Sequence, residues 1–229
     1  MAGGLTRFTH RKALALSFDD GPGAVTADVL DLLSAHEARA TFFLKGQAIV
    51  KRQEIARRTA LDGHELGNHT FNHPRLGTLT TADLEQELRS TSDLIDEVAG
   101  RRPRLFRPPY GLDGLEAAPV ARELGMVTVR WSVNPKDLLE NVPERTADAL
   151  IAGARHGAVA VLHDGGDDRH TLVRTLEIAL SALKTMGFEL ITVSELLERS
   201  HRARRQIVVR HRSAPRRALG TMRLRVARP

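Results

Sequence analysis

Two acidic residues, Asp19 and Asp20, come directly after an apolar run that begins at Ala13, and Gly21-Pro22 follow them. This pattern is typical of a buried strand that ends at a turn, because proline cannot donate to a β-ladder and glycine accepts unusual backbone angles. Carboxylates at the end of a buried strand are costly unless they bind a cation or transfer protons. An aspartate that only caps the next helix is the alternative interpretation.

Two histidines, His69 and His73, are four residues apart and precede Pro74. Imidazoles at this spacing can both bind one metal ion. Two histidines and one carboxylate form a common ligand set for a catalytic zinc site, which leaves a position for water. The chain has no cysteine, so thiolate ligands are excluded and Asp19 or Asp20 is the obvious third ligand. A pair of surface histidines remains the alternative.

The elements that must position these residues alternate between apolar β-rich runs and segments with helical spacing. Such alternation favours parallel βαβ units, arranged as an open sheet or a barrel. No G-x-G-x-x-G motif opens a helix, so a dinucleotide-binding sheet has no support. A barrel places functional residues at the carboxyl ends of its strands, where the polar clusters of this sequence fall. The predicted strands are 13–18, 40–44, 64–66, 105–106, 126–131, 158–162 and 188–193; the predicted helices are 24–36, 47–61, 81–99, 116–124, 143–154, 170–186 and 194–199.

The charge of the chain divides it into two parts. Residues 199–229 contain eleven arginines and no acidic residue, whereas residues 1–198 contain 23 basic and 28 acidic residues. The sequence therefore predicts a folded domain over 1–198 and an Arg-rich, disordered tail over 199–229. With 41% hydrophobic residues, the domain has enough apolar material for a sizeable core. No apolar run approaches the roughly 18 residues of a membrane helix, and Met1 to His10 does not look like a signal peptide, so the location is left open.

Five ordered motifs carry a family resemblance that extends from residue 13 to about 197. The motifs are Ser17–Pro22, His69–Pro74, Arg107–Gly111, Trp131–Leu138 and Leu162–Asp164. The sequence resembles the polysaccharide deacetylases of the NodB-homology type, carbohydrate esterase family four. The resemblance implies a distorted (β/α) barrel, here with about seven parallel strands. It also implies a metal-dependent hydrolase that removes N-acetyl groups from N-acetylglucosamine-containing glycans, either chitin oligosaccharides or peptidoglycan. Small non-sugar amides and O-acetyl groups on xylan-like polymers are alternative substrates.

The resemblance also separates Asp19 from Asp20. It implies that Asp20, His69 and His73 bind the divalent metal, with zinc expected first and cobalt or manganese as alternatives. It implies that Asp19 is the general base that takes a proton from the metal-activated water. Arg107 would hold Asp19 as its charged partner.

The remaining catalytic roles follow from the later motifs in the same way. The backbone N–H of Tyr110 would stabilise the oxyanion, and His163 would protonate the departing amine. Asp137 would orient the His163 imidazole and raise its pKa. We expect substrate contacts from Tyr110, Trp131 and Leu162.

The fourth motif departs from the family pattern at Asn134, in place of an acidic residue, and at Leu138, in place of an aromatic residue. That aromatic normally forms a wall of the acetyl pocket, so we expect a looser acyl preference. One tryptophan, one tyrosine and seven phenylalanines are few for stacking sugars, which favours short subsites over a long groove.

We expect a carbohydrate substrate and a monomer. We expect no nucleic-acid partner, because the body of the chain is net acidic. The basic tail is either a dispensable extension or a contact for anionic cell-wall or membrane polymers. A catalytically inactive carbohydrate-binding relative and a nucleic-acid-associated protein are the rival functions. The intact set of acidic and histidine residues argues against the first, and the acidic body argues against the second.

Overall fold

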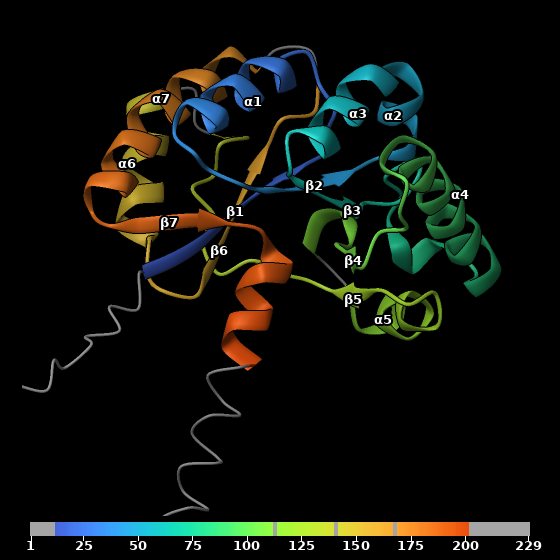
Figure 1. The fold of residues 1–229 in the computed structure, drawn as a ribbon. Helices are drawn as coiled ribbons and strands as arrows, with labels where there is room; N and C mark the ends of the chain where they lie inside the picture. The colour runs from blue at the N-terminus through green and yellow to red at the C-terminus, as the bar shows by residue number, and fades with distance from the viewer. Residues whose placement is uncertain (1–11, 112–113, 140–141, 167–168, 202–229) are drawn as a thin grey trace, which may run out of the picture.

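The computed structural model describes residues 12–111, 114–139, 142–166 and 169–201. A parallel seven-stranded sheet forms the centre, and helices pack around its outside (Figure 1). The strands are β1 Lys12–Asp19, β2 Thr41–Leu44, β3 Glu65–Asn68, β4 Leu105–Phe106, β5 Val127–Thr128, β6 Ala158–His163 and β7 Phe188–Ile191. The helices are α1 Thr26–Ala35, α2 Gly46–Lys51, α3 Gln53–Leu61, α4 Thr81–Ala99, α5 Gly114–Glu123, α6 Pro143–Gly153 and α7 His170–Thr185, with short 3-10 turns η1 Leu76–Thr78 and η2 Pro109–Gly111.

Strand β1 is the centre of the sheet, whose order is β5-β4-β3-β2-β1-β6. Its last residues, Ser17 to Asp19, pair with β2, and its first residues, Lys12 to Ala15, pair with β7. Strand β6 pairs with β1 from Leu14 to Asp19. Every strand pair is parallel, so the carboxyl ends of the strands meet at one end of the sheet.

The segment from Val127 to Val133 joins the two edges of the sheet. Val127 and Thr128 pair with β4, whereas Val133 forms a parallel bridge with Ala160 of β6. The sheet is therefore closed into a distorted barrel, which confirms the predicted fold class. The same crossing explains why the strand predicted at 126–131 is much shorter, since the chain leaves β4 after Thr128 to reach β6.

The alternation of side chains separates an outer core from the barrel interior. In β1, Leu14, Leu16 and Phe18 belong to the large cluster between the sheet and the helices. Ala13 and Ala15 belong to the interior cluster. Ser17 and Asp19 share the parity of the interior residues, so the alternation places both inside the barrel at its carboxyl end.

Residues 193–201 form a last helix, whose Val193 and Leu196 pack in the interior cluster beside Ala13 and Ala15. This helix closes the barrel at the end away from Asp19. Arg199 pairs with Glu189 at 2.7 Å and with Glu195 at 2.6 Å, so it belongs to the folded body and not to the tail predicted over 199–229. The division into domain and tail stays a prediction, because residues 202–229 lie outside the described residues.

The predicted helix over 47–61 is two helices, α2 and α3, separated at Arg52. Arg52 has φ −142° and ψ 52°, which interrupts the helical backbone. Ile49 and Ala56 are buried on either side of the break, so the apolar spacing continues across it and could not locate it. Within the described residues, no helix is both long and apolar enough to cross a lipid bilayer.

Helix α4 spans the predicted residues, Thr81–Ala99. The Thr80 side chain accepts a hydrogen bond from the Asp83 backbone N–H at its start, and Gly100 ends it with φ 67°. Leu84, Leu88 and other apolar residues of α4 face the core. The polar residues on the opposite face of the helix can therefore contact neighbouring loops.

Candidate active site

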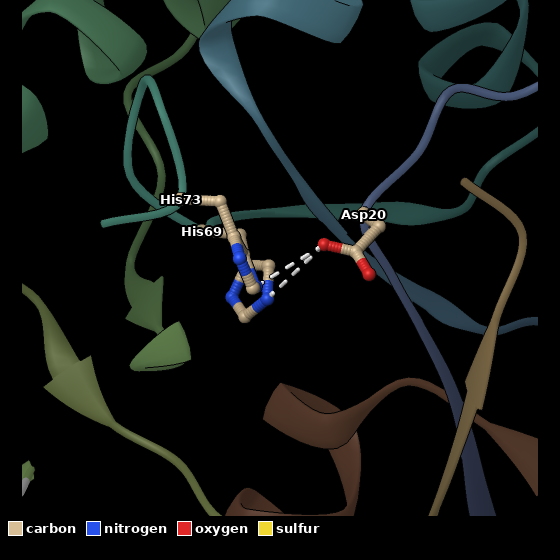
Figure 2. A group of neighbouring side chains, drawn as sticks. All are labelled: Asp20, His69 and His73. Carbon is tan, nitrogen blue, oxygen red and sulfur yellow. Dashed lines mark ion pairs between the residues drawn. The ribbon is translucent and has the colours of Figure 1, made fainter. Parts of the chain in front are cut away.

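Asp20, His69 and His73 converge at the carboxyl end of the barrel. Nε2 of His73 lies 3.3 Å from Oδ1 of Asp20, and Nε2 of His69 lies 3.8 Å from the same oxygen. One ligand atom from each residue lies within 4.8 Å of the other two. Figure 2 shows the two imidazoles directed toward a single carboxylate oxygen. The three predicted metal ligands are therefore close enough to share one ion.

The protonation states of these residues fit a divalent cation. Nδ1 of His69 donates to the carbonyl oxygen of Arg107 at 2.7 Å, which leaves its Nε2 lone pair facing Asp20. Burial lowers the pKa of His69, and it lowers the pKa of His73 to about 4, so both rings are neutral near pH 7. Among the described residues, no hydrogen bond reaches the buried Oδ1 of Asp20. The donor set of two imidazoles and one carboxylate suits zinc.

A lysine that the sequence analysis missed also faces this carboxylate. Nζ of Lys45, directly after β2, lies 3.5 Å from Oδ1 of Asp20. Burial acts to raise the pKa of Asp20, but His69, Lys45 and His73 together lower it below its ordinary value. Asp20 is therefore ionised, as a ligand must be. The one signal for Lys45 in the sequence was its place at a strand end.

Asp19 and Arg107 form a buried ion pair beside the three ligands. Nη1 of Arg107 donates to Oδ1 of Asp19 at 2.7 Å and to the Ser17 hydroxyl at 2.8 Å. The guanidinium lies over the ring of Phe43, 4.0 Å from its centroid, and 5.7 Å from that of Trp131. Burial lowers the pKa of Arg107, and Asp19 opposes this shift. The rings and the hydroxyl hold Arg107 in one orientation, and Arg107 in turn holds Asp19.

The second oxygen of Asp19 faces the metal ligands. Oδ2 of Asp19 lies 4.0 Å from Nε2 of His69, while Oδ1 is engaged by Arg107. Asp19 is 3% exposed, so its free oxygen is directed into the site and not toward bulk water. This division of the two oxygens suits a base that is fixed by one atom and reactive at the other.

His163 stands next to Asp19, because the two residues are register partners on β6 and β1. Its Nδ1 lies 3.0 Å from Oδ1 of Asp137, and its backbone N–H donates to Oδ2 of Asp137 at 2.8 Å. Burial alone would lower the pKa of His163, but the hydrogen bond and charge of Asp137, with Asp19 and Asp20, raise it above its ordinary value. Asp137 has the contacts expected of a residue that orients this imidazole.

Asp164, the residue after His163, is a buried carboxyl group in the same corner. Its Oδ2 accepts a hydrogen bond from the Thr26 hydroxyl at 2.5 Å. Burial raises the pKa of Asp164 to about 7. The turn after Asp20 packs directly on it, since a Cβ on Gly21 would lie 2.4 Å from Oδ2 of Asp164. Gly21 therefore permits a close approach that any side chain would prevent.

The three predicted substrate-contact residues differ in exposure. Tyr110 is 51% exposed, and its ring meets the His73 ring edge-on at 4.6 Å. Trp131 is half-buried and packs against Gly111. Leu162 is fully buried in the outer core, because its parity in β6 directs it to the helices. The structure thus brings Tyr110 and Trp131 to the site but leaves Leu162 away from the barrel interior.

The two departures in the fourth motif lie on the rim near His163. Asn134 is exposed, and its Oδ1 accepts the backbone N–H of Lys136 at 2.8 Å in a turn. Leu138 is 50% exposed directly after the buried Asp137. Neither residue is part of the hydrogen-bonded pair of His163 and Asp137, so the departures alter the rim and leave that pair intact.

Comparisons with known proteins identify the family of the chain. A family model described as polysaccharide deacetylase matches residues 6–129, more than half of the chain. The structure of peptidoglycan deacetylase PdaC from Bacillus subtilis is similar with a TM-score of 0.81 and 30% identity, over 88% of this chain and 98% of that one.

The relatives that are similar in sequence include two deacetylases. The peptidoglycan-N-acetylglucosamine deacetylase PgdA of Listeria monocytogenes is 33% identical over 186 residues, which are 81% of this chain and 39% of that protein. A chitooligosaccharide deacetylase of Bradyrhizobium sp. is 34% identical over 198 residues, which cover 81% of this chain and 90% of that protein. The chain therefore spans well under half the length of the first relative and most of the second.

Proposed function

This chain belongs to the polysaccharide deacetylase family, and we propose that it hydrolyses the N-acetyl groups of N-acetylglucosamine-containing glycans. The observation that carries the proposal is the convergence of Asp20, His69 and His73 with the free oxygen of Asp19, 4.0 Å from Nε2 of His69. This arrangement supports a base acting beside a bound cation. The names of the relatives support two substrates, peptidoglycan and chitin oligosaccharides.

The reaction requires activation because an amide is a poor electrophile with a poor leaving group. A divalent ion at Asp20, His69 and His73, with zinc favoured by the donor set, supplies a Lewis acid that polarises the carbonyl and acidifies water. Oδ2 of Asp19 accepts the proton of the attacking water as its oxygen bonds to the carbonyl carbon. Arg107 keeps Oδ1 of Asp19 engaged, so the base cannot turn away.

His163 completes the cleavage on the other side of the carbon. With Nδ1 held by Asp137, the protonated imidazole can donate from Nε2 to the departing nitrogen as the C–N bond breaks. The products are acetate and the free amine. The backbone N–H of Tyr110 is the proposed donor to the oxyanion, at a residue whose φ of 61° sets the direction of that peptide.

Acetate release tests the proposal. Purified protein would be incubated with chitin oligosaccharides and with peptidoglycan, with and without zinc, and compared with Asp20→Ala. We expect zinc-dependent acetate release that Asp20→Ala abolishes. Asp93→Ala is the matched control. Asp93 is an exposed carboxylate of α4, and its ion pair is with Arg102 and not with any residue of the proposed site. Full activity of Asp20→Ala would overturn the metal assignment.

The same assay separates the substrate classes. Acetate release from acetylated xylan or from small amides, but not from the two glycans, would replace the proposed substrate. Acetate release from none of them by a zinc-binding protein would favour an inactive carbohydrate-binding relative. Monomeric state and the absence of a nucleic-acid partner stay predictions, and the Arg-rich segment 202–229 lies outside the described residues.

A further inference from the structure

The loop that carries His73 has a strained backbone. Thr70 has φ 67° and His73 has φ 59°, values in the left-handed region. A β-branched residue such as threonine is a conformational outlier there. Such residues each cost on the order of 1–3 kcal/mol and persist only where the surroundings fix them. Something outside the loop must therefore hold it.

Helix α2 holds one side of this loop. The backbone N–H groups of Gly46 and Gln47 donate to the carbonyl oxygens of Thr70 and Phe71 at 3.0 and 3.1 Å. The Phe71 ring packs on Gly46, where a Cβ would lie 2.2 Å from the ring. These contacts fix the carbonyl groups of the loop and leave its N–H groups to another partner.

Glu87 of α4 accepts those N–H groups. Its Oε2 accepts from the backbone N–H of Phe71 at 2.7 Å and of Asn72 at 2.8 Å. Its Oε1 accepts from the Asn72 side-chain amide at 2.6 Å. Hydrogen bonds to an ionised carboxylate are roughly twice as strong as neutral ones. One side chain thus secures the two residues that directly precede His73.

Asn68 provides a second link between α4 and the loop. Its side-chain amide donates to the Leu88 carbonyl at 2.8 Å and to the Ser92 hydroxyl at 3.0 Å. Its Oδ1 accepts the Thr70 backbone N–H at 2.8 Å. Helix α4 therefore braces the loop at two points, at Thr70 through Asn68 and at Phe71 and Asn72 through Glu87.

We propose that Glu87 is a positioning residue for metal binding, which holds the strained segment between His69 and His73 so that both Nε2 atoms meet Asp20. The inference rests on the proposed metal site. Glu87 touches neither the ion nor the substrate in this role. Its effect reaches the ion through the backbone of Phe71 and Asn72, as outer partners of metal ligands do in other sites.

The test is the equilibrium affinity for zinc, measured by competition with a chelator and without any substrate. We expect Glu87→Ala to weaken zinc binding by about 10–100-fold, the usual effect of losing such an outer partner. Glu87→Gln keeps a carbonyl oxygen for the two backbone N–H groups but loses the charge, so its affinity should fall between those of Glu87→Ala and wild type. Glu85→Gln is the matched control, because Glu85 lies on the same helix and pairs with Arg89.

Thermal unfolding with and without zinc distinguishes positioning from general support. If Glu87 positions the ligands, Glu87→Ala should reduce the increase in unfolding temperature that zinc produces. If Glu87 only supports the fold, Glu87→Ala should lower the unfolding temperature equally with and without zinc. Zinc affinity of folded Glu87→Ala equal to wild type would overturn the inference. If Glu87→Ala does not fold, Glu87→Gln decides: equal affinity to Glu85→Gln overturns it, and weaker affinity supports it. Zinc binding by wild type without acetate release would refute the deacetylase proposal and leave this inference standing.

Discussion

Oδ1 of Asp137 lies 3.0 Å from Nδ1 of His163, while Oδ2 of the same carboxylate accepts the backbone N–H of His163. The aspartate therefore fixes both the ring and the main chain of the proposed acid. Because it accepts from Nδ1, the proton available for transfer is on Nε2. Asp137 orients this ring and, with Asp19 and Asp20, raises its pKa.

Asp137→Asn should move the alkaline limb of the pH–rate profile to lower pH. The acid is active when protonated, and Asp137 raises the pKa of His163, so protonated His163 persists to higher pH in wild type. Without that charge we expect the limb to move to lower pH, with a lower kcat. Asp148→Asn, an exposed change on α6, is the control. An unmoved limb would contradict the assignment of His163.

Arg107→Met should destabilise the protein strongly. It would leave the buried Asp19 carboxylate without its cation, which typically costs about 3–5 kcal/mol. Urea unfolding of the apo-protein measures this loss. The double variant Arg107→Met with Asp19→Asn should recover part of the stability, because no unpaired charge remains, and yet stay inactive. A loss below about 1 kcal/mol in the single variant would be incompatible with a buried ion pair.

Lys45→Met should strengthen zinc binding. The Lys45 ammonium lies 3.5 Å from Oδ1 of Asp20 and repels a cation that uses the same oxygen. We expect roughly a several-fold tighter dissociation constant by chelator competition. Lys51→Met, an exposed change at the end of α2, should have no effect. Weaker zinc binding by Lys45→Met would instead mean that the lysine holds Asp20 in its ligand position.

Asp164→Asn should raise the free energy of unfolding, relative to wild type, by more at pH 8 than at pH 5. The folded pKa of Asp164 is about 7, above its unfolded value, so the folded state binds more protons between about 4 and 7. Its contribution to stability is therefore present at low pH and is lost as the pH rises through that window. Asparagine does not titrate, so the difference between variant and wild type grows with pH. Urea unfolding at the two pH values measures it, and a pH-independent difference would argue against a neutral Asp164.

Leu138→Trp should restrict the acyl group that the enzyme accepts. Leu138 stands on the rim where the family pattern has an aromatic wall, and a larger side chain there leaves less space. We expect the ratio of turnover on N-propionyl to N-acetyl substrates to fall by about 10-fold, the effect of one methylene in a shaped pocket. Leu139→Trp is the control, because Leu139 is 83% exposed. Unchanged turnover on both substrates would remove Leu138 from the acyl pocket.

Local patterns predicted the parallel βαβ units and the polar clusters at the strand ends, whereas the barrel and the separate roles of the site residues came from the family resemblance. An apolar run followed by a polar cluster identifies a strand and its carboxyl end, and parallel pairing then brings those ends together. Asp19 and His163 meet for this reason. The helix over 81–99 was equally predictable, since a capping threonine, an apolar stripe and a terminal glycine all agree.

The parts that sequence could not predict depend on contacts between distant segments. Glu87 looks like any polar residue on an amphipathic helix, and its role appears once the loop at Phe71 lies against it. Leu162 shares a motif with His163 but points to the opposite side of β6, which only the sheet parity reveals. The short β5 follows from the crossing of the chain to Ala160, a tertiary requirement with no local signature.

The pairing of β1 also sets the order in which the enzyme can be assembled. Its partner β2 follows closely in the chain, but β6 and β7 are made last. A chain emerging from the ribosome therefore contains Asp20, His69 and His73, the three proposed metal ligands, well before His163 and β6 are made. Such distant pairing slows folding, because a long loop must close before its contacts form. The proposed ligand residues and the proposed proton donor can therefore meet in one site only after β6 has been made.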